Sequence, residues 1–224
     1  MAWKTPLSHY IPEFKHPDPA VREKANLIDF LRHSTGLSSP QLLILGPRGT
    51  LIHPEKDFVQ LMNTSPSCDE NGSRHNRWWS YDNWGYGLVA VALERVYQRH
   101  YEDILRQKFL SPLNLSRTVV DSSELSQDSN IAYPYVVLDN GTFHRSTSDK
   151  WTYQNHRPAN AALGMRSCVR DMLSWALCVL ESEKESKKEE AISITKKGTY
   201  GHSQRLSDPK GTMDKAVAGQ EPHQ

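Results

Sequence analysis

Four features that would assign the chain to a large class of proteins are missing from its sequence. Its three cysteines, Cys68, Cys168 and Cys178, are too few and too scattered for a disulfide framework, and no C-x-x-C pair suggests a zinc ribbon. No run approaches 18 consecutive apolar residues, and the residues after Met1 have no apolar core of signal-peptide length. We therefore expect a cytoplasmic protein in a reducing compartment, without a membrane partner.

An excess of charge of one sign is also missing. The 27 Lys and Arg residues balance the 26 Asp and Glu residues, for a formal net charge of +1. Arg74, Arg77, Trp78 and Trp79 mix basic and aromatic side chains that can stack on bases, but they lie in a chain with no basic surplus. We therefore expect no nucleic-acid partner.

The ten histidines form no metal-binding string. No H-E-x-x-H motif occurs, and no histidine pair combines helical spacing with a carboxylate between its members. We expect scattered surface histidines, no metal and no cofactor.

Apolar residues are unevenly distributed along the 224 residues, which are enough for one domain of ordinary size. Ser182 to Glu190 consists almost wholly of Ser, Glu and Lys, and few large apolar residues follow. Such a segment buries too little surface to offset its ordering entropy. We predict a domain over residues 1–182 and a polar, mostly disordered tail over 183–224, whose start can extend the preceding helix.

Apolar periodicity and capping residues predict four helices. They are a short helix after the cap Asn26, ended by Gly36; an all-round apolar and therefore buried helix over 84–97; a helix over 101–110, stopped by Pro112; and a helix over 168–181, capped by Ser167.

The remaining segments favour extended or irregular structure. Prolines around Leu7–Phe14 indicate an extended chain docked on the domain, and Leu42–Leu45 favours a strand. Residues 63–76 have the composition of a polar surface loop, and the turn signal Asp139-Asn140-Gly141 predicts a hairpin over 131–145.

Tyr81 and Asn83 form the most informative local pattern. They stand two residues apart just before the buried helix, so in an extended segment their side chains point the same way. A phenol and an amide beside the positive end of a helix can move protons and hold a substrate carbonyl. The structural alternative is that Asn83 caps the helix and Tyr81 packs in the core.

Five phrases, taken in order, resemble the serine β-lactamase-like family, which also contains penicillin-binding proteins, D-aminopeptidases and related esterases and transesterases. The phrases are Tyr10-Ile11-Pro12-Glu13-Phe14 (YxPEF-like), Phe30–Leu37 (LLTHTSGL-like), Tyr81-Asp82-Asn83 (Y-x-N), Pro112–Leu115 (PLGM-like) and Ala162–Met172 (GGLxSTAxDLAxF-like). The resemblance covers roughly residues 5–182 and implies an α+β, β-lactamase/transpeptidase-like fold, of which this chain covers mostly the helical part with an incomplete sheet.

The resemblance also implies a mechanism. A Ser in S-x-x-K is the nucleophile, a Tyr relays its proton, an Asn orients substrate and Lys, and a K-T-G or H-x-G strand completes the site. Tyr81 would be the proton relay and Asn83 the positioning amide. The implied reaction is hydrolysis or acyl transfer on an ester, amide or lactam of a small metabolite, as in secondary metabolism, through an acyl-serine intermediate.

The departures from the family pattern concern the nucleophile and the last motif. In the family, S-x-x-K precedes the YxPEF-like phrase, at which this chain almost starts, so we expect an N-terminally truncated and inactive chain. The strings Ser193–Lys196 and Ser207–Lys210 follow Tyr81, in the polar tail, and Gly201–Gln204 is a degenerate H-x-G phrase. The alternative function is a non-catalytic fragment or pseudoenzyme that acts as a binding module. The sequence leaves the oligomeric state open.

Overall fold

The computed structural model describes residues 1–40, 52–120, 130–133, 135–145 and 157–197, with side chains up to residue 187. Its chain divides into two compact units. The first contains residues 1–102 and 119–166, and the second contains residues 103–118 and 167–224.

Short helices and two hairpins make up the described part of the first unit. Its helical elements are α1 (Leu7–Tyr10), α2 (Pro19–Lys24), α3 (Leu27–Leu31), the 3₁₀ turn η2 (Glu55–Asp57), α5 (Phe58–Asn63), α6 (Asn83–Tyr97), α8 (Arg157–Ala159) and the π-helical turn η5 (Asn160–Gly164). Antiparallel hairpins join β1 (Cys68–Asp69) to β2 (Gly72–Ser73) and β3 (Tyr135–Val137) to β4 (Phe143–Arg145).

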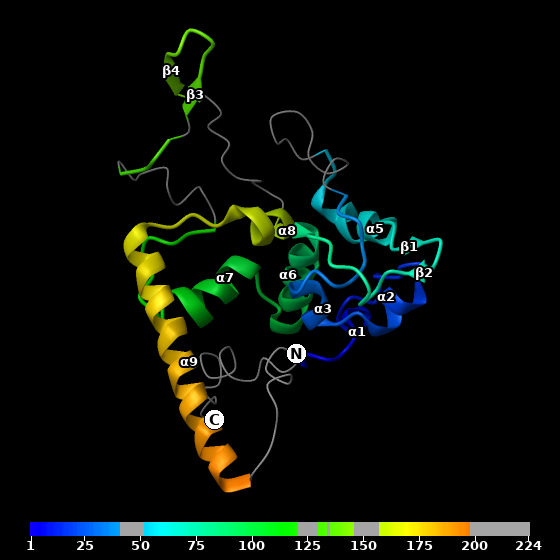
Figure 1. Ribbon diagram of the computed structural model, residues 1–224. Coiled ribbons are helices and arrows are strands. Elements are labelled where there is room, and N and C mark those ends of the chain that lie inside the picture. Colours follow the sequence, from blue (N-terminus) through cyan, green and yellow to red (C-terminus); the bar gives the residue numbers. More distant parts are fainter. Residues whose placement is uncertain (41–51, 121–129, 134, 146–156, 198–224) are drawn as a thin grey trace. The chain divides into compact units, whose positions relative to one another are not determined.

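Helix α6 is the element around which the first unit packs, with α1, α3 and α8 against it (Figure 1). It buries Trp84, Leu88 and Ala92 completely, because apolar residues surround most of its circumference. The predicted buried helix over 84–97 is confirmed and begins one residue earlier.

Residues from the whole first unit complete the core around α6. The buried apolar cluster consists of Leu7, Ile11, Phe14, Val21, Ala25, Leu27, Phe30, Leu37, Phe58, Met62, Trp84, Leu88, Ala92 and Ala159. Roughly 25 cal/mol of stabilisation accompanies each Å² of apolar surface that such a cluster removes from water. The core therefore holds the start of α6 in place from several sides.

The N-terminal segment is docked as predicted but is not extended. Leu7–Tyr10 forms one helical turn, and Leu7, Ile11 and Phe14 are buried in the core. The six-residue helix α2, for which no prediction was made, begins at Pro19 with Asp18 as its cap. Proline at the first helical position lacks only an N–H that has no helical partner there, so it favours such a start.

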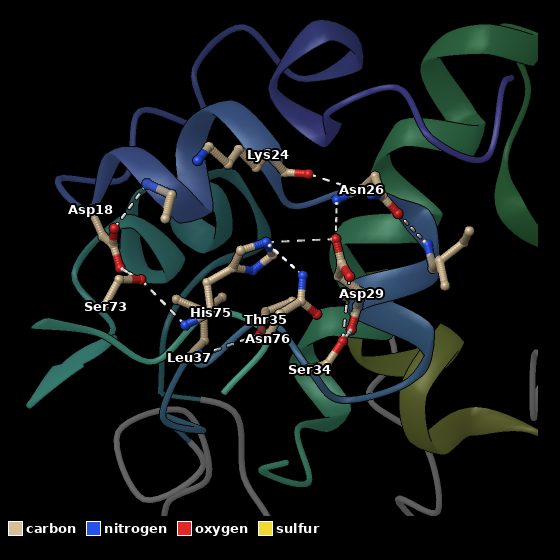
Figure 2. Close-up of polar contacts among 12 residues, drawn as sticks. Asp18, Lys24, Asn26, Asp29, Ser34, Thr35, Leu37, Ser73, His75 and Asn76 are labelled. Carbon is tan, nitrogen blue, oxygen red and sulfur yellow. Dashed lines mark hydrogen bonds and ion pairs between the residues drawn. The ribbon is translucent and has the colours of Figure 1, made fainter. Parts of the chain in front are cut away.

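Residues 63–76 are polar, but they do not form a simple surface loop. They contain the β1–β2 hairpin, and Asn63, Ser65 and Ser67 are buried. Figure 2 shows Ser73 facing Asp18 and His75 facing Asp29. Hydrogen bonds to the N-terminal helices thus take the place of the water that a surface loop would contact.

Helix α3 has the predicted Asn26 cap, and Asp29 completes a capping box with it. The first left-handed residue after the helix is His33 (φ 60°) rather than Gly36. Gly36 (φ 81°) serves a close approach instead: a Cβ there would lie 2.6 Å from the backbone carbonyl carbon of Arg74.

Helices make up most of the described part of the second unit, whereas residues 111–118 form turns and irregular chain. Helix α7 (Tyr101–Leu105) starts at the end of the first unit and continues as a π-helical turn, η3 (Arg106–Leu110), so the predicted 101–110 helix is confirmed in extent. Helix α9 (Val169–Lys197) starts close to the predicted position but runs 16 residues beyond residue 181.

Asp171, in the first turn of α9, connects the start of this helix to residues 117 and 118. The Asp171 carboxylate accepts hydrogen bonds from the Arg117 backbone N–H (2.9 Å) and the Thr118 hydroxyl (2.8 Å). Ser167 contacts that same hydroxyl at 2.8 Å. Burial alone would raise the pKa of Asp171, but these hydrogen bonds together lower it.

The described residues contain only two-stranded sheets and are rich in helix, which confirms the prediction of an α+β chain with an incomplete sheet. The predicted hairpin over 131–145 is confirmed, whereas the strand expected at 42–45 lies outside the described residues. None of the helices seen has both the length and the apolar character needed to cross a membrane.

Candidate active site

Tyr81 and Asn83 lie at the N-terminus of α6, and the structural alternative for both residues is wrong. Asp82, not Asn83, caps the helix: its Oδ1 accepts the Trp84 backbone N–H at 3.1 Å. Asn83 is the first helical residue and is half-buried. The Tyr81 side chain is 57% exposed and does not pack in the core. The phenol is therefore free to meet a ligand.

Tyr81 belongs to a cluster of four rings centred on His33, which we call the His33 cluster. The His33 ring centroid lies 4.7 Å from that of Tyr81, 5.4 Å from that of Tyr86 and 5.7 Å from that of Trp79. Trp79, two residues before Tyr81, is 69% exposed. The cluster thus places an exposed apolar surface beside the Tyr81 phenol.

The backbone on each side of Tyr81 is bonded to His33. The Ser80 N–H donates to the His33 carbonyl oxygen (3.0 Å), and the Asp82 N–H donates to His33 Nδ1 (3.1 Å). His33 itself follows the end of α3, which packs on α6. The segment with Tyr81 is therefore fastened to the same core as the helix that follows it.

The groups around Tyr81 have perturbed acidity. Burial raises the pKa of Tyr86, and the neighbouring Tyr81 raises it further. The Tyr86 hydroxyl donates to the Leu31 carbonyl oxygen at 2.9 Å. Burial also raises the pKa of the capping carboxyl Asp82, although hydrogen bonds from Trp84, Ser39 and Gly85 and the nearby His33 oppose this. Tyr86 is thereby kept as a neutral hydrogen-bond donor.

The arrangement is suited to proton transfer and carbonyl binding. Tyr81 presents an exposed phenol, which donates or accepts a proton, and Asn83 follows two residues later as the first residue of α6. Both lie at the helix end that carries a positive partial charge, which favours a developing negative charge.

The segment that leads into the fifth phrase supports α6 instead of adding a group to this end. Ala159 and Asn160 are buried, and α8 and η5 pack along α6. Arg157 of α8 pairs with Glu55 at 2.8 Å, and its Nε lies 3.9 Å from Glu94 of α6.

The two S-x-x-K strings lie more than 100 residues after Tyr81 in the sequence. Ser193–Lys196 lies in the last turns of α9, where only the backbone is described. Ser207–Lys210 and the Gly201–Gln204 phrase fall outside the described residues.

His33 is the residue whose importance the sequence did not reveal. The phrase that contains it was interpreted as a helix end, and 49 positions separate it from Asp82. The left-handed backbone is the feature that marks His33, and it appears in the backbone angles of the structure and not in the sequence. In the part of the chain that the structure describes, no three His, Cys, Asp or Glu side chains gather to hold a metal ion.

Solved structures similar to this one define the class of fold. A D-amino acid amidase from Ochrobactrum anthropi SV3 aligns with a TM-score of 0.61 and 18% identity, over 81% of this chain and 50% of the amidase. A class C β-lactamase from Rhodobacter sphaeroides aligns with a TM-score of 0.56 and 21% identity, over 82% and 45%. An octameric penicillin-binding protein homologue from Pyrococcus abyssi aligns with a TM-score of 0.56 and 18% identity, over 79% and 38%. The fold is that of the β-lactamase/transpeptidase-like proteins.

The sequence then assigns the family. The family model described as Beta-lactamase matches residues 1–219, nearly the whole chain. This chain belongs to the Beta-lactamase family, as its five phrases predicted. No curated protein matches it in sequence. It spans between 38% and 50% of the length of the three structures above.

Proposed function

We propose that this chain carries the proton-relay part of a β-lactamase-related serine hydrolase or acyltransferase, with Tyr81 as the relay and Asn83 as the positioning amide. The substrate is an ester, amide or lactam of a small molecule, attacked through an acyl-serine intermediate. One observation carries the proposal: the Tyr81 phenol is exposed at the start of α6 while both neighbouring peptides are bonded to His33.

The proposed chemistry needs a serine activated by a base. A serine hydroxyl is a weak nucleophile until an adjacent group removes its proton. Tyr81 accepts that proton as the Ser–acyl bond forms and passes it to the leaving group as the ester, amide or lactam bond breaks. Asn83 holds the substrate against the relay. Trp79 offers an apolar surface for the part of the substrate that does not react.

This chain has no S-x-x-K string before Tyr81. We therefore propose that by itself it forms no acyl-enzyme. Incubation with a fluorophosphonate or a penicillin probe, followed by intact-mass measurement, should leave its mass unchanged. A stoichiometric adduct would overturn this part of the proposal and lead, through peptide mapping, to the nucleophile in use.

Full-length cDNA sequencing can identify a longer transcript that encodes an in-frame S-x-x-K segment upstream of Met1. The protein encoded by that transcript is the one in which the role of Tyr81 as proton relay is tested. In that product Tyr81→Phe should slow acylation at least 100-fold, because general acid–base catalysis contributes on that order. Tyr97→Phe, at the other end of α6, is the matched control and should not slow it. An unchanged rate in Tyr81→Phe would remove Tyr81 from the mechanism.

The second candidate is a binding module that uses the same surface without catalysis. The exposed Trp79 beside Tyr81 favours it, since neither side chain needs a nucleophile to hold a ligand. Titration calorimetry of the present chain with a penicillin or a phenyl ester distinguishes the two. Saturable binding that Trp79→Ala weakens and Tyr97→Phe does not would support the binding module.

A further inference from the structure

His33 contacts the Tyr81 segment in three ways. Its carbonyl oxygen accepts the N–H of the residue before Tyr81, its Nδ1 accepts the N–H of the residue after, and its ring faces the Tyr81 ring at 4.7 Å. A single residue from the end of α3 thus fixes the peptide on both sides of the proposed relay.

We infer that His33 is a positioning residue for Tyr81 and that it acts only as a neutral imidazole with its proton on Nε2. That His33 positions a proton relay rests on the proposed function of Tyr81. The hydrogen bond from Asp82 and the tautomer of His33 do not depend on that function. An imidazole nitrogen accepts an N–H only when it carries no hydrogen of its own. The Asp82 N–H therefore assigns the unprotonated nitrogen to Nδ1.

The backbone of His33 supports a role for its side chain. His33 has φ 60°, in the left-handed region that glycine occupies at no steric cost. A residue with a side chain is held there at an energetic penalty, which the two hydrogen bonds to Ser80 and Asp82 offset. The imidazole is the part of His33 that a glycine would not provide.

Protonation of the ring releases one of these bonds. The imidazolium donates from both nitrogens, so Nδ1 then opposes the Asp82 N–H instead of accepting from it. The titratable groups that face the ring are the phenols of Tyr81 and Tyr86 and the buried carboxyl of Asp82. The Tyr81 segment is accordingly held when His33 is neutral and loosened when it is protonated.

The experiment is an NMR titration of the present chain, labelled with ¹⁵N and with ¹³C-tyrosine. At neutral pH, His33 should show an unprotonated Nδ1 and a protonated Nε2. As the pH falls, the Asp82 amide should exchange faster and the Tyr81 ring signals should shift with the same midpoint as the imidazole. The inverse tautomer, or Asp82 and Tyr81 signals that ignore the imidazole titration, would overturn the inference.

Two variants separate positioning from a merely structural role. His33→Phe keeps a ring but cannot accept, so the Asp82 amide should exchange about tenfold faster at neutral pH. His33→Asn keeps an acceptor oxygen and tolerates a left-handed backbone, so it should restore protection and abolish the pH dependence of Tyr81. His100→Asn, at an exposed histidine, is the control.

The outcomes stay interpretable if one variant folds poorly. Exchange of the Leu88 amide, in the buried middle of α6, reports global unfolding separately. If His33→Phe unfolds, the wild-type titration and the His33→Asn variant still test whether His33 positions the Tyr81 segment. Asn83 and Tyr81 can fail the acylation test while the His33 result holds, so failure of the proposed function and failure of this inference are distinguishable. If the Asp82 amide of a folded His33→Phe protein exchanges at the wild-type rate, the inference about His33 is overturned.

Discussion

At the scale of single residues, Asp18 shows how a polar side chain stabilises an interior. Its Oδ2 accepts from the hydroxyls of Ser67 (2.8 Å) and Ser73 (2.5 Å), and its Oδ1 accepts the Ala20 N–H at the start of α2. Burial alone would raise the pKa of Asp18, but the hydrogen bonds from Ser73, Ser67, Ala20 and Cys68 lower it from 3.8 to about 2. The charged carboxylate is thus the form that links the β1–β2 hairpin to the N-terminal helices.

Asp18→Asn should lower the free energy of unfolding by roughly 1–2 kcal/mol at pH 7. Asparagine still caps α2, so the loss isolates the carboxylate. Because folding lowers this pKa, the stabilisation is full above about pH 4 and disappears as the pH falls through about 2. Urea unfolding at pH 7, 5, 4 and 3 checks this, with the exposed Asp139→Asn as control. A difference from wild type that does not shrink in acid would contradict it.

At the scale of elements, α6 depends on two glycines that have different neighbours. A Cβ on Gly87 would lie 2.8 Å from Phe58 Cζ and 3.0 Å from the Pro158 backbone oxygen. A Cβ on Gly85 would lie 3.3 Å from Phe30 Cδ1, a side-chain atom, and 3.5 Å from Asp82 Oδ2. The nearest backbone atom to the Cβ on Gly87 is therefore at 3.0 Å, in α8, whereas the Cβ on Gly85 has backbone only at the ordinary contact distance of 3.7 Å, from the Phe30 oxygen.

Gly87→Ala should therefore destabilise the protein by about 1–2 kcal/mol, even though alanine gains about 1 kcal/mol in helix propensity. Gly85→Ala should change stability by less than about 1 kcal/mol, because the propensity gain offsets a small shift of Phe30. Denaturant midpoints of the two variants, compared at equal slope, measure this. Equal midpoints would contradict the close packing of α8 against Gly87 of α6.

At the scale of the whole molecule, one helix leaves a long apolar surface exposed. Val169, Leu173, Leu177 and Leu180 recur at spacings of three and four on α9, and each is more than half exposed. Exposed apolar surface of this extent is a site of association between molecules. The present chain should accordingly bind a hydrophobic dye and have limited solubility.

Leu173→Glu should reduce dye binding and raise solubility without lowering the thermal midpoint, because Leu173 is 60% exposed. Ser174→Glu adds the same charge at a neighbouring exposed position and removes no apolar surface, so it is the matched control. Dye fluorescence and light scattering against concentration measure both. Equal effects of the two variants would show that charge, and not the apolar face of α9, governs association.

Much of the candidate site was visible in the sequence because its signals are local. The Tyr81-Asp82-Asn83 phrase, the apolar helix behind it and the capping chemistry of Asn26 each depend on neighbours within a few residues. The choice of cap was not visible: Asp and Asn cap equally well. Asp82 is the cap, and its own N–H donates to His33, 49 positions away.

The sequence alone determined the family, the positions of the long helices and the identity of the two candidate residues, since periodicity and short phrases encode these. Only the tertiary structure decided that Tyr81 is exposed, that His33 holds its segment and that the polar 63–76 stretch is tied down by Asp18 and Asp29. Those facts depend on contacts between residues about fifty positions apart. The packing of the core brings such residues together, and no local pattern records it.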